Sequence, residues 1–161
     1  DYIARLLDRY NIDTQQKIIA CNPATSKESK NWSEDKFARV IDWINNNLEA
    51  QVLITGGPSD EAKARRITNK LTTRAINLVG KTSLKELAVL LKKVDLLLTG
   101  DTGPMHIAVT VDTPVLALYG PTAPQRYGPY HGQNIVIKSP SDDIEEIRVK
   151  TITDSLSRRF D

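Results

Sequence analysis

Two apolar segments near the middle of the chain constrain the fold most strongly. They run from Val94 to Thr99 and from Pro114 to Tyr119, and a polar turn and one short helix separate them. A strand with one solvent-exposed face alternates polar and apolar residues. Neither segment does so, and both are therefore typical of central strands in a parallel sheet. Two parallel strands joined through a helix form a right-handed crossover unit. The segment therefore predicts an α/β protein with a doubly wound, Rossmann-like parallel sheet.

The rest of the chain repeats this alternation. Four further strands are expected, at Lys17 to Asn22, Gln51 to Thr55, Ile76 to Val79 and Asn134 to Lys138. Helices are expected at about residues 33–48, 59–71, 83–92 and 149–159. Ser33 should cap the first of these helices, and Trp32 can pack onto Phe37 as a hydrophobic staple. Ser83 with Glu86 forms a capping box over a predicted apolar stripe of Leu84, Leu87, Leu90 and Leu91. No composition shift marks a second domain, so residues 1–161 are expected to fold as one domain.

Composition excludes several classes of protein. The net charge of +2 is too small to indicate a nucleic-acid binder. Cys21 is the only cysteine, so no intrachain disulfide can form and a reducing compartment such as the cytoplasm fits. No apolar run is long enough for a transmembrane segment. The chain opens at Asp1 within an amphipathic pattern, which leads us to expect a fragment of a longer protein.

Polar turns follow the predicted strands, and the carboxyl ends of parallel strands meet at one edge of the sheet. The first turn reads NPATSKESKNW and offers the hydroxyls of Thr25 and Ser26 with the mobile cation of Lys30. Hydroxyl donors beside a lysine suit a phosphate group. An ordinary solvated loop with surface lysines is the alternative.

The turn after Thr99 is the most informative, because folding alone does not demand its sequence. Asp101, Thr102 and Gly103 enter the mouth of a helix, and His106 follows one turn later. Free N–H groups and the positive end of the helix dipole make such a corner an anion-binding site. The alternatives are that Asp101 only caps the helix and that His106 only packs. The long Gly- and Pro-rich stretch from Gly120 to Gln133 is expected to be a binding loop.

Two other turns offer weaker candidates. Glu61 lies in the first turn of its predicted helix. It either accepts hydrogen bonds from ribose hydroxyls or only interacts favourably with the positive end of the helix dipole. Thr82 follows Lys81 in a turn that also reads as a plain helix entry. The sequence contains no G-x-G-x-x-G fingerprint, no P-loop, no G-x-S-x-G elbow and no cluster with metal-ligand spacing.

At these residues the chain resembles glycosyltransferase family 9, the ADP-heptose:lipopolysaccharide heptosyltransferases. The resemblance rests on Asp101-Thr102-Gly103-Pro104-Met105-His106, followed by a Pro-led strand that ends in Tyr119-Gly120-Pro121-Thr122, and it extends from about Lys17 to Lys138. It implies that the donor phosphates contact Thr25, Ser26 and Lys30, and that the donor ribose contacts Glu61. It also places Asp101, Thr102, Gly103 and His106 on the donor side. Thr82 stands where some members carry a methionine near the adenine.

The resemblance implies the C-terminal half of a two-domain GT-B enzyme. That half binds the ADP-sugar donor in an inverting transfer of heptose to the lipopolysaccharide inner core, and Lys30 stabilises the departing ADP. No cofactor and no metal are implied. The acceptor site and catalytic base would belong to an N-terminal domain absent from this chain, so the chain alone should be inactive. The parent would work in the cytoplasm, at the inner face of the inner membrane. A stand-alone nucleotide-sugar sensor and another nucleotide-sugar enzyme of the same fold remain the alternatives.

Overall fold

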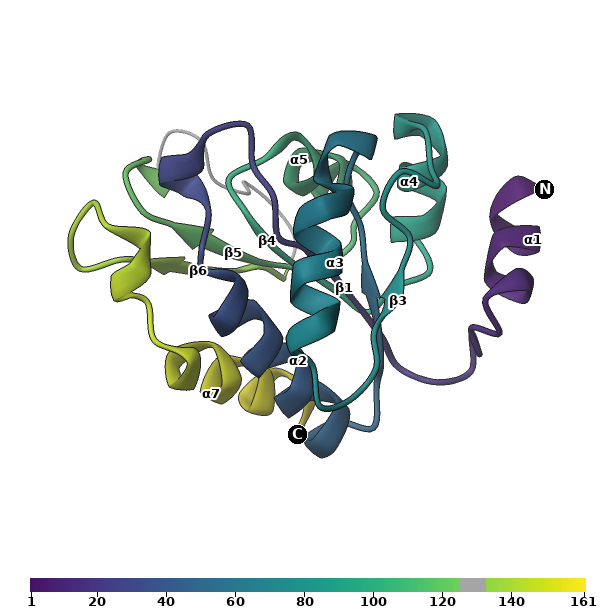
Figure 1. The fold of residues 1–161 in the computed structure, drawn as a ribbon, viewed down its shortest axis with the longest axis horizontal. Coiled ribbons are helices and arrows are strands. Elements are labelled where there is room, and N and C mark those ends of the chain that lie inside the picture. Colours follow the sequence, from purple (N-terminus) through teal and green to yellow (C-terminus); the bar gives the residue numbers. More distant parts are fainter. Residues whose placement is uncertain (125–132) are drawn as a thin grey trace.

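The structure is a computed structural model that describes residues 1–124 and 133–161. Within these ranges six parallel strands form one sheet in the order β3-β2-β1-β4-β5-β6 (Figure 1). Their bounds are β1 Ile18–Asn22, β2 Gln51–Ile54, β3 Ile76–Asn77, β4 Leu96–Gly100, β5 Val115–Tyr119 and β6 Ile135–Lys138. The predicted Rossmann-like parallel sheet is therefore confirmed.

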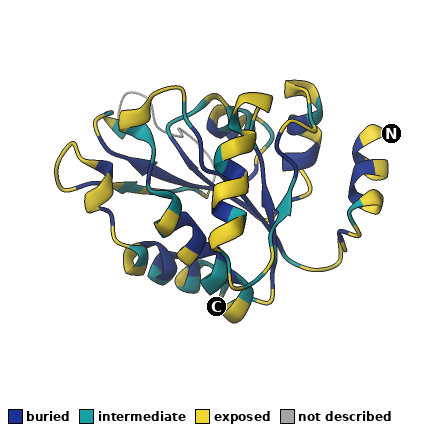
Figure 2. Cartoon of the chain, in the orientation of Figure 1, coloured by how far each residue is buried: buried dark blue, intermediate teal, exposed yellow. Residues whose placement is uncertain are grey.

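Helices cover both faces of the sheet. One face carries α2 (Glu34–Asn47), α3 (Glu61–Lys70) and α7 (Val149–Phe160). The opposite face carries α1 (Tyr2–Arg9), α4 (Leu84–Leu91) and α5 (Gly103–Thr110). Each layer closes its own apolar core against the sheet, and Figure 2 shows the buried strands between helices whose outer sides are exposed. This double covering explains why β1, β4 and β5 are buried along their whole length.

Most local expectations are confirmed. Ser33 caps α2 by accepting a hydrogen bond from the Lys36 amide, and the rings of Trp32 and Phe37 meet edge to face at 5.2 Å. The capping box of Ser83 and Glu86 is present at the start of α4. Two segments differ from the prediction. The third strand ends at Asn77, and residues 58–60 form a short 3₁₀ turn before α3.

Leu84 does not belong to the buried stripe of α4, contrary to the sequence prediction. Its relative exposure is 71%, whereas Leu87 is 6% exposed and Leu90 and Leu91 are fully buried. Leu84 is the first residue of α4, so it stands at the carboxyl edge of the sheet, beyond the packed layer. The spacing of apolar residues shows which face of a helix is buried. It does not show at which residue along the helix the packing against the neighbouring layer ends.

The strand order reverses between β1 and β4, since β2 follows β1 on one side and β5 follows β4 on the other. Ligands of doubly wound sheets bind at such a reversal, outside the carboxyl ends of the strands. In this protein the loops after Asn22 and Gly100 leave the sheet there. In the described residues, no helix has the length and apolar character needed to cross a membrane.

Candidate functional site

The loops that leave β1 and β4 touch each other directly above the strand reversal. Gly100 permits this contact: a Cβ atom there would lie 3.0 Å from Thr25 Cγ2 and 3.3 Å from the carbonyl oxygen of Lys30. Any larger side chain would push the β1 loop away from the end of β4. Gly100, which has no side chain, therefore allows the predicted turns after Asn22 and Thr99 to come together.

A salt bridge joins the two loops. Lys30 Nζ donates to Asp101 Oδ2 at 2.8 Å, and the side chains are 20% and 10% exposed. The residues are 71 positions apart in the chain, so only the fold brings them together. This single charge-assisted contact holds the lysine ammonium beside Asp101, two residues before α5 begins.

The N-terminus of α5 forms the other side of the corner, and the residue that caps it is Thr102. Thr102 Oγ1 accepts from the Met105 amide at 3.3 Å and lies 3.1 Å from Thr99 Oγ1. The alternative in which Asp101 caps the helix is therefore wrong, because the helix begins one residue later than that alternative requires. Asp101 is left free to pair with Lys30. Gly103 faces open space, since an added Cβ would meet nothing within 4 Å.

A cavity of about 370 Å³ opens between these loops and the start of α4. Predicted site residues that line it are Thr25, Ser26, Thr82, Thr102 and Gly103. Its α4 side is apolar through Leu84 and Leu87, which accounts for the exposed position of Leu84. Asn22, buried at the end of β1, also lines this cavity. Hydroxyls, a helix N-terminus and an apolar wall thus meet in one space.

A second cavity, of about 530 Å³, borders the salt bridge itself. Lys27, Lys30 and Asp101 line it together with the turn that follows β5, residues 121–123. The loop after β1 and the loop after β4 each line both cavities. The Lys30–Asp101 salt bridge joins these two loops. Lys27 and Lys30 carry two positive charges into the second cavity against the one negative charge of Asp101.

Two predicted site residues lie outside these cavities. Glu61 is exposed and pairs with Arg65 at 3.9 Å, one turn along α3. The acid that lines the first cavity is its neighbour Asp60, whose Oδ2 accepts from the Gly57 amide at 2.9 Å. Asp60 ends the short 3₁₀ turn of residues 58–60 and lines the cavity, whereas Glu61 begins α3. The sequence pattern predicts a helix from about residue 59 and does not indicate that turn.

His106 is the second residue that the structure separates from the corner. Its side chain is exposed, and it borders a shallow apolar groove with Ala88, Ile107, Thr110 and Val111. Thr102, with φ of −144°, is not helical, so a spacing of four from Thr102 does not place His106 above it. His131 and most of the predicted loop from Gly120 to Gln133 lie outside the described residues.

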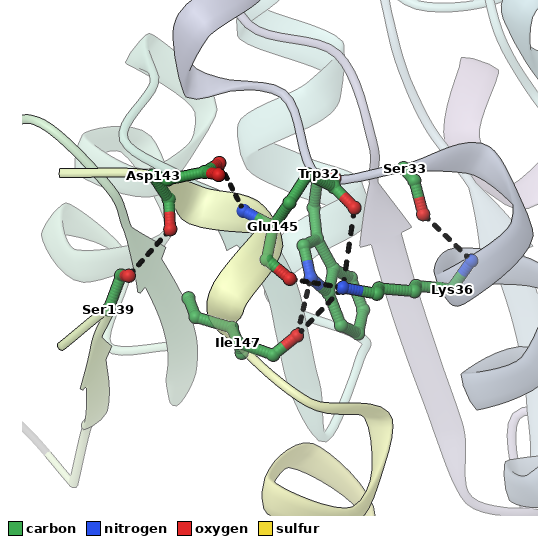
Figure 3. A network of polar contacts seen from close by, with 7 residues as sticks. All are labelled: Trp32, Ser33, Lys36, Ser139, Asp143, Glu145 and Ile147. Atoms are coloured by element: carbon green, nitrogen blue, oxygen red, sulfur yellow. Dashed lines mark hydrogen bonds and ion pairs between the residues drawn. The ribbon is translucent and has the colours of Figure 1, made fainter. Parts of the chain in front are cut away.

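Behind the β1 loop, a polar network ties residues 32–36 to the segment that enters α7 (Figure 3). The indole of Trp32 donates to the Ile147 carbonyl at 3.1 Å, and Lys36 Nζ donates to the carbonyls of Glu145 and Ile147. Trp32 is 1% exposed. These contacts anchor the loop that carries Lys30 from the side opposite the cavities.

Burial shifts the pKa of two groups near the carboxyl ends of β5 and β1. Burial, and secondly the charge of Asp101, raise the pKa of Tyr119. Burial raises the pKa of Cys21 to about 12, so this thiol stays protonated and is no nucleophile. Among the residues that the structure describes, no group of three or more His, Cys, Asp or Glu side chains could hold a metal ion. The corner has the chemistry to bind an anion next to a group that is partly apolar.

Comparisons with known proteins fit this geometry. The sequence model of glycosyltransferase family 9 (heptosyltransferase) matches residues 4–156. A lipopolysaccharide core heptosyltransferase, OpsX, of Haemophilus influenzae is 35% identical over 130 residues, which cover 78% of this chain and 37% of that protein.

Solved structures share the fold. A glycosyltransferase of family 9 from Veillonella parvula superposes with a TM-score of 0.91 and 25% identity, over 97% of this chain and 49% of that one. The Escherichia coli heptosyltransferase WaaC, solved with ADP, gives a TM-score of 0.81 at 22% identity, over 97% of this chain and 48% of that one. The chain spans about half the length of these solved proteins and less of the curated relative. The chain belongs to glycosyltransferase family 9, the heptosyltransferases.

Proposed function

We propose that this chain is the donor-binding half of an inverting heptosyltransferase that acts in lipopolysaccharide core synthesis, and that its ligand is ADP-heptose. The observation that carries the proposal is the Lys30–Asp101 salt bridge, which stands at the mouth of α5 between loops that border two cavities. The family match and the ADP held by a solved protein of the same fold support this choice of donor.

The roles follow from the chemistry of each part of the site. The diphosphate lies against Lys30, the hydroxyls of Thr25 and Ser26, and the free end of α5 at Thr102 and Gly103. The nucleoside occupies the first cavity, where Leu84 and Leu87 supply an apolar wall and Thr82 lies at the rim. Asp60 takes the ribose contact that the family resemblance implies for Glu61, because Asp60 lines the cavity.

The transfer step explains why a cation and a helix end belong here. The acceptor hydroxyl oxygen bonds to the anomeric carbon as the bond to the β-phosphate oxygen breaks, and that electron pair leaves with ADP. Lys30 and the N–H groups of α5 stabilise the charge that grows on the departing diphosphate. A charge-assisted hydrogen bond contributes roughly 1.5–3 kcal/mol. The acceptor and the base that takes its proton belong to the other half of the enzyme.

The acceptor is the lipopolysaccharide core, and the reaction takes place in the cytoplasm at the inner face of the inner membrane, where a lipid-linked acceptor is presented. The chain alone transfers no sugar, because an inverting transfer needs a positioned acceptor and a general base. This division of roles also separates the proposal from a stand-alone sensor, for which a second half would bring no activity.

Calorimetric titration tests the donor class. The chain is titrated with ADP, UDP, GDP and dTDP in the presence of a metal chelator. We expect binding to ADP in preference to the other three. Equal binding of all four diphosphates would overturn the choice of ADP, and no binding of any of them would overturn the proposed site.

A further inference from the structure

The salt bridge itself supports one step beyond the proposed function, on which this step rests. We propose that Asp101 is an internal competitor for the nucleoside diphosphate: its carboxylate occupies Lys30 in the empty site, and the phosphates must displace it to bind. The consequence is a lower affinity for the free nucleoside diphosphate, which is the product that the enzyme must release.

The contacts of the two side chains carry this inference. Lys30 Nζ makes its one side-chain hydrogen bond of the described region to Asp101 Oδ2, at 2.8 Å. Both groups border the second cavity, so a phosphate that enters can approach the same ammonium. Within residues 1–124 and 133–161, the Asp101 carboxylate accepts no hydrogen bond other than that of Lys30, and the cap of α5 is provided by Thr102.

Electrostatics gives the sign of the effect. Opposite charges about 4–6 Å apart still attract at the effective dielectric constant of a protein surface, and like charges repel to the same extent. With Asp101 ionised, a diphosphate loses part of the attraction of Lys30 and meets a like charge beside the site. With a neutral group at this position, Lys27 and Lys30 face the ligand without a competing anion. Removal of a carboxylate from a binding site is therefore expected to strengthen ligand binding.

The test compares three probes on the 161-residue chain: ADP, inorganic pyrophosphate and adenosine. For Asp101→Asn we expect ADP to bind about tenfold more tightly, with a similar gain for pyrophosphate. Adenosine binding should stay unchanged, because adenosine has no phosphate for Lys30. Asp101→Ala should show the same pattern, which guards against an effect peculiar to the amide.

Glu28→Gln is the matched control. It also removes one negative charge near the site, from the exposed first residue of the short 3₁₀ turn that ends at Lys30, but it frees no lysine in the site. We expect its effect on ADP to be about twofold or less, as for a screened surface charge. Circular dichroism verifies that each variant is folded.

Each outcome bears on the inference. Unchanged or weaker ADP binding by folded Asp101 variants would overturn it, while the proposed function would stand. An equal gain for adenosine, or an equal gain from Glu28→Gln, would also overturn it, because the effect would then not pass through Lys30 and the phosphates. If the unaltered chain bound neither ADP nor pyrophosphate, the proposed function would fall and this inference with it.

Discussion

Two ion pairs of this protein use the same chemistry and are built differently. Arg66 in α3 holds Glu34 in α2 through three hydrogen bonds of 2.8–3.1 Å, and the pair joins two helices of one layer. Lys30 holds Asp101 through one hydrogen bond of 2.8 Å, and the pair joins two loops at the rim of a cavity. A forked pair resists exchange, whereas a single contact beside an open space can pass its lysine to another anion.

The surroundings of the two pairs deepen this difference. Arg66 is 57% exposed, so water and salt screen the surface pair. Lys30 and Asp101 are only 20% and 10% exposed, which makes their charges more effective on whatever enters the cavity. The less buttressed pair is the one for which we propose a function, because the proposed binding step requires a contact that can be replaced.

The largest effect is expected from Lys30→Met, which keeps the length of the side chain and removes its charge. We expect ADP affinity to fall by about 10- to 100-fold, the value of one charge-assisted hydrogen bond. Calorimetry measures the affinity. Lys93→Met is the control, since Lys93 is exposed, follows the end of α4 and lines neither cavity. An equal loss of ADP affinity from both variants would mean that the site responds only to the total positive charge of the protein.

A second test acts on the helix end rather than on the lysine. Thr102→Ala removes the oxygen that caps α5, so we expect a loss of about 1 kcal/mol in the free energy of unfolding. ADP binding should also weaken, because the N-terminal turn of α5 becomes less ordered. Denaturant unfolding and calorimetry measure the two effects, and Thr102→Ser should restore most of both. If Thr102→Ala lost stability with ADP affinity unchanged, the helix end would have no part in phosphate binding.

Trp32→Phe tests the anchor behind the loop that carries Lys30. It keeps an aromatic ring against Phe37 and removes the hydrogen bond to the Ile147 carbonyl, which Lys36 still contacts at 3.3 Å. We expect a loss of about 1–3 kcal/mol in the free energy of unfolding, because the hydrogen bond is lost and the smaller ring leaves space in the core where the buried indole packs. ADP affinity should fall about twofold. Unchanged ADP affinity in the folded variant would show that this network does not position the loop that carries Lys30.

The smallest effect is expected at the surface pair. The hydrogen bond from Arg66 lowers the pKa of the Glu34 carboxyl below its ordinary value of 4.5, so the pair stabilises the fold above that pH. Glu34→Gln should therefore cause a small drop in melting temperature at neutral pH, with no change in ADP binding. The difference from the unaltered chain should vanish as the pH falls through the lowered pKa. A difference that persists in acid would have to come from packing.

The sequence predicts the layers of this fold well, because apolar periodicity and capping residues are local signals. Trp32 with Phe37 and the Ser83–Glu86 box are examples, since each joins residues a few positions apart. The site is predicted less completely. The Lys30–Asp101 and Trp32–Ile147 contacts join residues that are 71 and 115 positions apart in the chain. No local sequence pattern indicates which residues meet over such separations.

The differences between the expected and the observed positions of single site residues also have local causes. Asp101 and Thr102 are both good capping residues, and only the observed start of α5 at Gly103 decides between them. Asp60 and Glu61 are adjacent acids, and the 3₁₀ turn before α3 determines which one reaches the cavity. His106 shows a third cause. It follows Thr102 by four residues, but Thr102 is not helical, so the spacing of a helical turn does not apply between them.

The central claim is that a diphosphate binds where the loops after β1 and β4 meet. The most direct measurement is the change in backbone amide NMR signals of the chain on addition of ADP. We predict the largest shifts at Ser26, Asp101 and Gly103, with little change at residues 144–147 behind the loop. Shifts centred instead on the groove beside His106, or on the Arg66–Glu34 pair, would contradict the account.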